Sequence, residues 1–95
     1  MDATNVIKTL TDHRSELEQF KVKDLWMFGS ASRGEMEVGD IDLLVEFTTP
    51  PTLVEFVELK EYLQHLLSLP IDLVSKRGCN DRFLEEIAAD LRHVA

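Results

Sequence analysis

The residues best suited to chemistry lie where one apolar segment ends and the next begins. Leu25–Phe28 runs into Gly29 and Ser30, and the second apolar segment opens with Asp40 and Asp42. On a β-strand, side chains two positions apart point to the same face, about 7 Å apart along the backbone. Two ionised carboxylates so close repel each other, and a divalent hard cation such as Mg²⁺ relieves the repulsion by lying between them.

The Gly29-Ser30 pair adds a second kind of binding group to this stretch. We expect a turn here that opens a short helix over residues 30–36. Backbone N–H groups at such a turn bind phosphate oxygens. Because Mg²⁺ takes carboxylate oxygens together with substrate phosphates, the stretch predicts a site for a nucleotide and a metal.

Three motifs in combination make this stretch specific. They are Gly29-Ser30, Arg33-Gly34-Glu35 and Asp40-Ile41-Asp42-Leu43. Together they resemble the signature of the polymerase-β nucleotidyltransferase superfamily. Within it, the chain is similar to the minimal nucleotidyltransferases, small domains often encoded beside a HEPN-domain partner as toxin–antitoxin pairs. The resemblance covers nearly the whole chain from about Leu25, and it implies a polymerase-β-like nucleotidyltransferase fold.

The resemblance implies that three carboxylates form the catalytic and metal-binding centre. Asp40 and Asp42 would hold Mg²⁺ on the nucleotide phosphates, and Asp72 would share a metal or act as base on the attacking hydroxyl. Asp72 is charged within an otherwise apolar strand expected over residues 71–74, which is costly without a partner. If that strand lies beside the strand of Asp40 and Asp42, about 4.8 Å away, Asp72 joins them. The alternative is an edge-strand aspartate that faces water.

The same resemblance assigns nucleotide binding to three further residues. Gly29 and Ser30 would hold the triphosphate, and Arg33 would offset the charge that builds on the transferring phosphoryl group. The chain departs from the family pattern in the loop that follows. Nine residues separate Ser30 from Asp40, one fewer than is usual, and Gly39 stands where a serine is common. We therefore expect a tighter loop.

The elements that must position these residues alternate along the chain. Hydrophobic periodicity and turn residues predict helices over residues 4–20, 30–36, 52–67 and 82–93 and strands over residues 22–28, 40–47 and 71–74. Short connections before the second strand favour antiparallel or mixed pairing. The predicted fold class is therefore α/β (α+β), a small mixed β-sheet covered by helices, in a single nucleotidyltransferase domain over residues 1–95.

Composition narrows the choice of partners and compartment. With 18 acidic and 10 basic residues, the net charge is −8, which argues against direct nucleic-acid binding and permits a basic protein partner. No apolar run approaches the roughly 20 residues of a membrane span, and the N-terminus does not resemble a signal peptide. The single Cys79 cannot form an internal disulfide, so we expect a reducing cytoplasm.

Two functions follow from these observations. The preferred one is a nucleotidyltransferase that moves a nucleoside monophosphate from a nucleotide triphosphate to a hydroxyl acceptor with Mg²⁺. The resemblance implies AMP from ATP as the donor and a HEPN toxin as the acceptor, so the protein would act as an antitoxin. The alternative is a non-catalytic antitoxin that neutralises its partner sterically. The presence of Asp40, Asp42 and Asp72 favours the enzyme.

Overall fold

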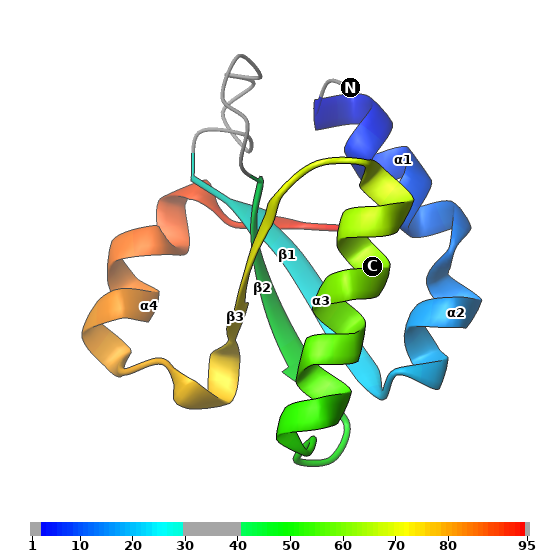
Figure 1. Cartoon of the computed structure of the whole chain (residues 1–95). Coiled ribbons are helices and arrows are strands. Elements are labelled where there is room, and N and C mark those ends of the chain that lie inside the picture. The colour runs from blue at the N-terminus through cyan, green and yellow to red at the C-terminus, as the bar shows by residue number, and fades with distance from the viewer. Residues whose placement is uncertain (1–2, 30–40, 95) are drawn as a thin grey trace.

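The computed structural model describes residues 3–29 and 41–94 of the 95-residue chain. Helices and strands alternate over most of the described chain, as the sequence predicts (Figure 1). In chain order the elements are α1 (Ala3–Asp12), α2 (Arg14–Gln19), β1 (Val22–Phe28), β2 (Ile41–Phe47), α3 (Leu53–Leu67), β3 (Ile71–Ser75), α4 (Asp81–Ile87) and β4 (Arg92–His93), with 3-10 turns at Lys76–Gly78 and Ala88–Asp90.

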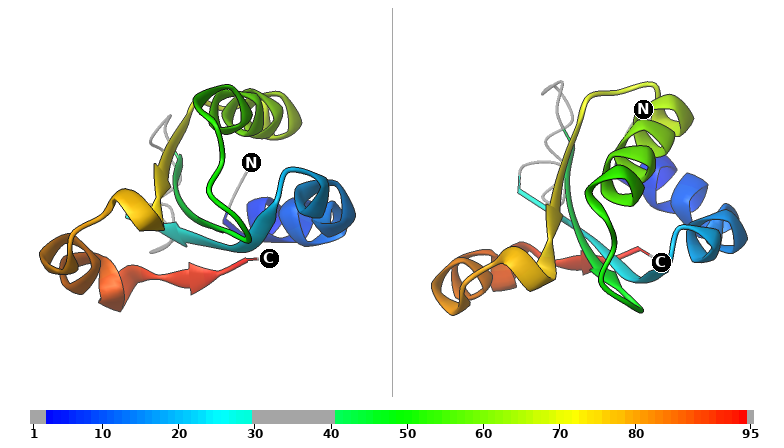
Figure 2. Two further views of the ribbon diagram at one scale, coloured as in Figure 1. Left: turned by 90° about the horizontal axis from the view of Figure 1, so that it is seen from below. Right: turned by 60° about the horizontal axis from the view of Figure 1, so that its bottom comes forward.

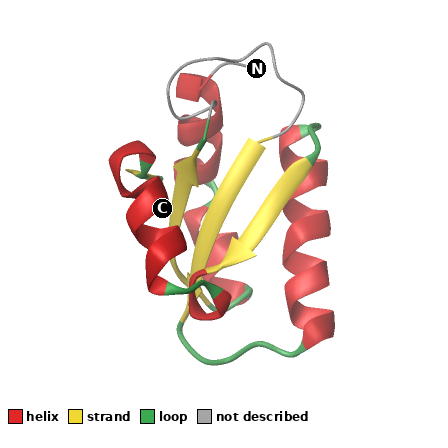
Figure 3. Cartoon of the chain, turned by 90° about the vertical axis from the view of Figure 1, so that its left-hand side faces the viewer, coloured by secondary structure: helices red, strands yellow, loops and turns green. Residues whose placement is uncertain are grey.

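The described strands form one mixed sheet in the order β3-β2-β1-β4. β1 pairs antiparallel with both β2 and β4, whereas β2 and β3 run parallel, side by side, as Figure 3 shows. The parallel connection crosses over through α3, whose length suits such a crossover. The prediction of a small mixed sheet with helices is therefore confirmed.

Helices lie on both faces of this sheet. The helices α1, α2 and α3 pack on one face and enclose the hydrophobic core, while α4 lies on the other (Figure 2). Side chains alternate between the two faces of the sheet along each strand, so one face is apolar and lies on the core. Ile41, Leu43 and Val45 of β2 point together into it. The remaining core residues include Val6, Leu10, Leu17, Leu25, Met27, Leu59, Leu63, Leu67, Ile71, Leu73 and Val94.

The predicted single helix over residues 4–20 is wrong in one respect, because the helix is interrupted at His13. This residue has φ −105° and ψ 21°, and it separates α1 from α2. Its amide donates to the carbonyl oxygens of both Thr9 and Leu10 at 3.2 Å, and its ring Nδ1 lies 2.8 Å from the Thr9 carbonyl oxygen. The interruption redirects the chain, so that Leu10 and Leu17 are both buried.

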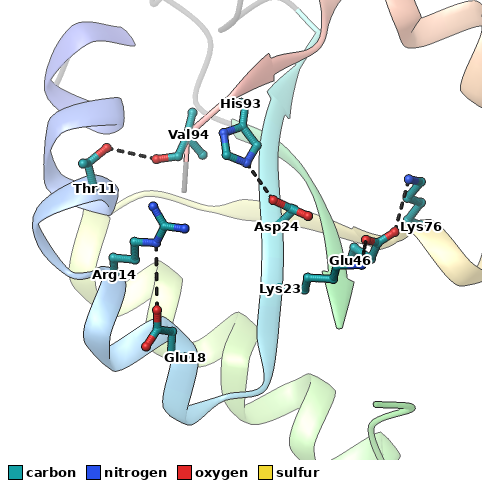
Figure 4. A network of polar contacts seen from close by, with 9 residues as sticks. All are labelled: Thr11, Arg14, Glu18, Lys23, Asp24, Glu46, Lys76, His93 and Val94. Carbon is teal, nitrogen blue, oxygen red and sulfur yellow. Dashed lines mark hydrogen bonds and ion pairs between the residues drawn. The ribbon is translucent and has the colours of Figure 1, made fainter. Parts of the chain in front are cut away.

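The predicted final helix over residues 82–93 is also wrong, since α4 ends at Ile87 and the chain continues into β4. The Val94 amide donates to the Leu25 carbonyl oxygen at 2.9 Å, and the Val94 carbonyl oxygen accepts from Thr11 Oγ1 at 2.9 Å. His93 Nε2 lies 2.9 Å from Asp24 Oδ1 (Figure 4). Pairing with the edge of β1 thus competes successfully with helix formation.

The remaining boundaries differ little from the predictions. β2 begins at Ile41, α3 spans Leu53–Leu67, and β3 continues one residue past the predicted end to Ser75. The helix predicted over residues 30–36 lies outside the described residues. No helix in the described part of the chain is both long and apolar enough to cross a membrane.

Candidate active site

Two of the three predicted carboxylates lie next to each other at one end of the sheet. Asp42 near the start of β2 is in direct register with Asp72 near the start of β3. Residues in direct register project to the same face, and neighbouring strands are about 4.8 Å apart. Asp42 is half-buried and Asp72 is exposed. The structure therefore brings together two acidic side chains that are 30 positions apart in the sequence, on a face that solvent reaches.

Gly29 lies against the Asp42 carboxylate, directly after the end of β1 at the same end of the sheet. Its φ of +74° lies in the left-handed region that glycine tolerates and other residues rarely adopt. A Cβ atom added at Gly29 would overlap Asp42 Oδ2. The position of Asp42 thus leaves no room for a side chain at Gly29, and the positive φ independently favours glycine there.

Phe28, the aromatic residue that precedes Gly29, lies beside Asp42 in the sheet. Phe28 is directly opposite Asp42 in the antiparallel register of β1 and β2, and it is only 8% exposed. Its ring meets the edge of the Phe83 ring of α4, with centroids 6.0 Å apart. Sequence analysis missed this contact between α4 and the site, because it depends on the register of β1 against β2.

The other predicted site residues, Ser30, Arg33 and Asp40, lie outside the described residues. Within residues 3–29 and 41–94, no group of three His, Cys, Asp or Glu side chains is arranged to hold a metal. The pair formed by Asp42 and Asp72 supplies carboxylate oxygens, the ligands that Mg²⁺ prefers in proteins. This donor set fits a hard divalent cation.

Comparison with known proteins places the chain in a family. The nucleotidyltransferase domain family matches residues 7–93, which is most of the chain. The chain therefore belongs to the nucleotidyltransferase domain family, and it is a nucleotidyltransferase. The resemblance that the three motifs carry is confirmed.

Two relatives define its place within the family more closely. The chain is 41% identical over 87 residues to the protein adenylyltransferase MntA of Thermococcus cleftensis, covering 90% of this chain and 88% of that protein. A solved structure of a protein assigned as a minimal nucleotidyltransferase superposes with a TM-score of 0.82 at 32% identity, covering 97% of this chain and 95% of that one. The chain is thus similar to the minimal nucleotidyltransferases.

A more distant structure shares the fold. It comes from a complex of a tri-AMPylated Shewanella oneidensis HEPN toxin with an MNT antitoxin, and the TM-score is 0.68 at 20% identity. The match covers 94% of this chain and 71% of that one.

Proposed function

We propose that this protein transfers AMP from ATP to a hydroxyl group of a partner protein, and that it acts in this way as the antitoxin of a HEPN toxin. The observation that carries the proposal is the direct register of Asp42 with Asp72 beside the Gly29 turn. The similarity to a protein adenylyltransferase supports the choice of AMP and of a protein acceptor. The fold shared with a complex of an AMPylated HEPN toxin supports the choice of partner.

The proposed chemistry is a single displacement at the α-phosphorus of ATP. The acceptor hydroxyl gives its proton to the Asp72 carboxylate, and its oxygen forms a bond to the α-phosphorus. The bond from the α-phosphorus to the oxygen that bridges to the β-phosphate breaks, and pyrophosphate leaves with the electron pair. Asp72 suits the role of base because its side chain is exposed at the edge of the site.

The other proposed roles concern the nucleotide. Asp40 and Asp42, with Asp72 beside them, would hold Mg²⁺, which when bound neutralises phosphate charge and orients the triphosphate. Gly29 and Ser30 bind phosphate oxygens through backbone N–H groups and the Ser30 hydroxyl. Arg33 offsets the negative charge that builds during transfer.

The proposed setting is a complex with the partner in a reducing cytoplasm. A net charge of −8 suits a partner with a basic surface, because complementary charge speeds association. Cys79 is a free thiol, which agrees with a reducing compartment.

The experiment is mass spectrometry of the co-purified HEPN partner after incubation with ATP and Mg²⁺. The wild type should add AMP to the partner. Asp72→Asn keeps the shape of the side chain and removes the base, so transfer should fall by about 10²- to 10⁴-fold while the complex still forms on size exclusion. Asp12→Asn is the matched control, because Asp12 is an exposed aspartate at the end of α1. It should transfer AMP at the wild-type rate.

Two outcomes would contradict this function. A wild type that neutralises its partner without added mass, and an Asp72→Asn variant that neutralises it equally well, would establish steric neutralisation instead. Equal transfer by the wild type and Asp72→Asn would leave the enzyme standing and remove Asp72 from its mechanism.

A further inference from the structure

We propose that the acceptor segment of the partner protein binds as an added β-strand along the outer edge of β3. The segment places its hydroxyl-bearing residue, a serine, threonine or tyrosine, directly opposite Asp72. This inference rests on the proposed function and specifies how the acceptor is recognised.

The first observation is that β3 has an open edge. In the described part of the chain, β3 is the outermost strand of the sheet and pairs only with β2, as Figure 3 also shows. The Ile41 amide donates to the Pro70 carbonyl oxygen at 3.1 Å, and Ile41 is in register with Ile71. In a parallel ladder this pattern directs the backbone groups of alternate β3 residues to β2 and turns the others outward. The outward groups belong to Ile71, Leu73 and Ser75.

Two of the six outward groups already have partners. The Ile71 amide donates to Gln64 Oε1 of α3 at 3.3 Å, and the Ser75 carbonyl oxygen accepts from Cys79 Sγ at 3.3 Å. Within residues 3–29 and 41–94, no side chain or loop is found to bond the other four. These four are the Ile71 carbonyl, the Leu73 amide, the Leu73 carbonyl and the Ser75 amide.

The four remaining groups can bond an added strand that runs in either direction. A parallel strand would bond through one residue to the Ile71 carbonyl and the Leu73 amide, and through the residue two positions later to the Leu73 carbonyl and the Ser75 amide. An antiparallel strand would exchange both bonds with Leu73 and add one bond each to the Ile71 carbonyl and the Ser75 amide. The occupied groups of Ile71 and Ser75 therefore limit the length of the added ladder and leave its direction to experiment.

In either direction the added strand brings the acceptor hydroxyl to the proposed base. The residue placed opposite Asp72 lies about 4.8 Å away and projects to the same face of the sheet. Asp72 is exposed, with Asp42 in register on its other side. The acceptor, Asp72 and Asp42 would then lie in one row across three strands.

A second observation comes from α3. Leu53 is 79% exposed and Val57 is 43% exposed, although both are large apolar residues. At 3.6 residues per turn, Leu53, Val57 and Gln64 fall on one line along the helix. Gln64 reaches the edge of β3, so this line faces the open edge. The residue after the acceptor hydroxyl points to the α3 side of the sheet, and we expect it to be apolar.

Proline at position 75 tests the edge in the intact protein. Ser75 has φ −83°, which proline adopts, and its amide points away from β2, so the ladder with β2 is kept. Ser75→Pro removes one of the four groups and places a ring on the edge. The KM for the partner protein should rise roughly tenfold or more, while calorimetry gives an unchanged affinity for a non-hydrolysable ATP analogue. Ser75→Ala loses the same hydroxyl, keeps the amide and should behave as the wild type.

A second experiment uses the unaltered enzyme and does not depend on how a variant folds. The acceptors are synthetic peptides that carry the sequence of the partner's modified segment. That segment is first identified by mass spectrometry of the modified partner. N-methylation two residues after the acceptor removes the bond to the Leu73 carbonyl in a parallel strand. N-methylation one residue after the acceptor removes the bond to the Ile71 carbonyl in an antiparallel strand. One of the two peptides should therefore show a KM raised roughly tenfold or more, and the other should behave as the unmodified peptide.

Each result has a separate meaning. A raised KM for one peptide alone supports strand addition, and the position of its methyl group gives the direction of the strand. Equal use of both peptides, with a Ser75→Pro variant that transfers normally, would overturn strand addition while adenylyl transfer stands. A wild type that binds the nucleotide but modifies neither protein nor peptide would overturn the proposed function itself.

Discussion

The carboxylate of Asp42 is positioned by residues from two distant parts of the chain. Phe28 lies opposite it on β1, Gly29 packs directly against it, and Asp72 lies beside it on β3. Each neighbour restricts what the others can be. The absence of a side chain at position 29 leaves the space that the Asp42 carboxylate occupies.

Replacement of Gly29 by alanine tests this crowding. The φ of +74° and the overlap of the new Cβ with Asp42 both oppose alanine, so the unfolding free energy should fall by about 1–2 kcal/mol. Affinity for a non-hydrolysable ATP analogue should fall as well, since Asp42 must shift. Thermal unfolding and calorimetry give the two values.

Gly78→Ala is the matched control, because a Cβ at Gly78 has no atom within 4 Å. It should leave stability and nucleotide affinity unchanged. Equal melting temperatures for the Gly29→Ala and Gly78→Ala proteins would show that position 29 tolerates a side chain.

Among the elements, α3 has a capped N-terminus and lies beside the edge of β3 to which we propose that the acceptor segment binds. Its first turn is closed by a capping box, in which the Glu55 amide donates to Thr52 Oγ1 at 3.1 Å and the Thr52 amide donates to Glu55 Oε1 at 2.8 Å.

Lys21 Nζ lies 2.7 Å from Glu55 Oε2. The hydrogen bond from Lys21, followed by that from the Thr52 amide, holds the pKa of Glu55 below its usual value. Glu55 therefore favours the folded state above its unfolded pKa, and this contribution is lost as the pH falls through the lower folded value.

The capping box predicts the effect of Thr52→Ala. Loss of the hydroxyl leaves the Glu55 amide without its acceptor, and such caps are worth about 1 kcal/mol. Urea unfolding at neutral pH should give a decrease of that size. Thr49→Ala removes an equally exposed threonine that lies outside the helix, and it should change the unfolding free energy by less than about 0.5 kcal/mol. If the two threonine variants unfold alike, the cap contributes nothing measurable.

At the scale of the whole molecule, the core of the described residues leaves one buried side-chain polar atom unsatisfied. The Tyr62 ring of α3 packs on Phe20 after α2, with centroids 4.9 Å apart. Its hydroxyl oxygen is buried and has no hydrogen-bond partner among the described residues. Burial, followed by the negative charge of Glu16, raises the pKa of Tyr62 above its usual value. Folding thus pays a desolvation penalty here without a compensating bond.

We expect Tyr62→Phe to be neutral or stabilising, by up to about 1 kcal/mol, because it removes an unsatisfied hydroxyl and keeps the ring. The raised pKa means that the folded state holds the phenolic proton more tightly than the unfolded state. Wild-type stability should therefore be maintained below the unfolded pKa of tyrosine, near 10, and should decrease as the pH rises toward the folded value. Urea midpoints measured across this range should show a smaller alkaline decrease for Tyr62→Phe. A destabilised phenylalanine variant at neutral pH would mean that the hydroxyl has a partner in solution.

The sequence by itself determined the features that depend on local pattern. The continuous apolar run before Gly29 and the alternation after Asp40 predict β1 and β2. The capping residue Thr52 and the apolar stripe after it predict α3 within one residue. The motifs around Ser30 and Asp40 predict the family, and the match of the nucleotidyltransferase domain over residues 7–93 confirms it.

Only the tertiary structure decided the features that depend on contacts between distant segments. The break at His13 and the strand at Arg92–His93 replace predicted helix, since packing of Leu17 and pairing of β4 with β1 outweigh local helix propensity. The direct register of Asp42 with Asp72 likewise depends on the crossover through α3, and no local pattern encodes it. The open edge of β3 arises in the same way, because strand order is set by how helices and strands bury their apolar faces together.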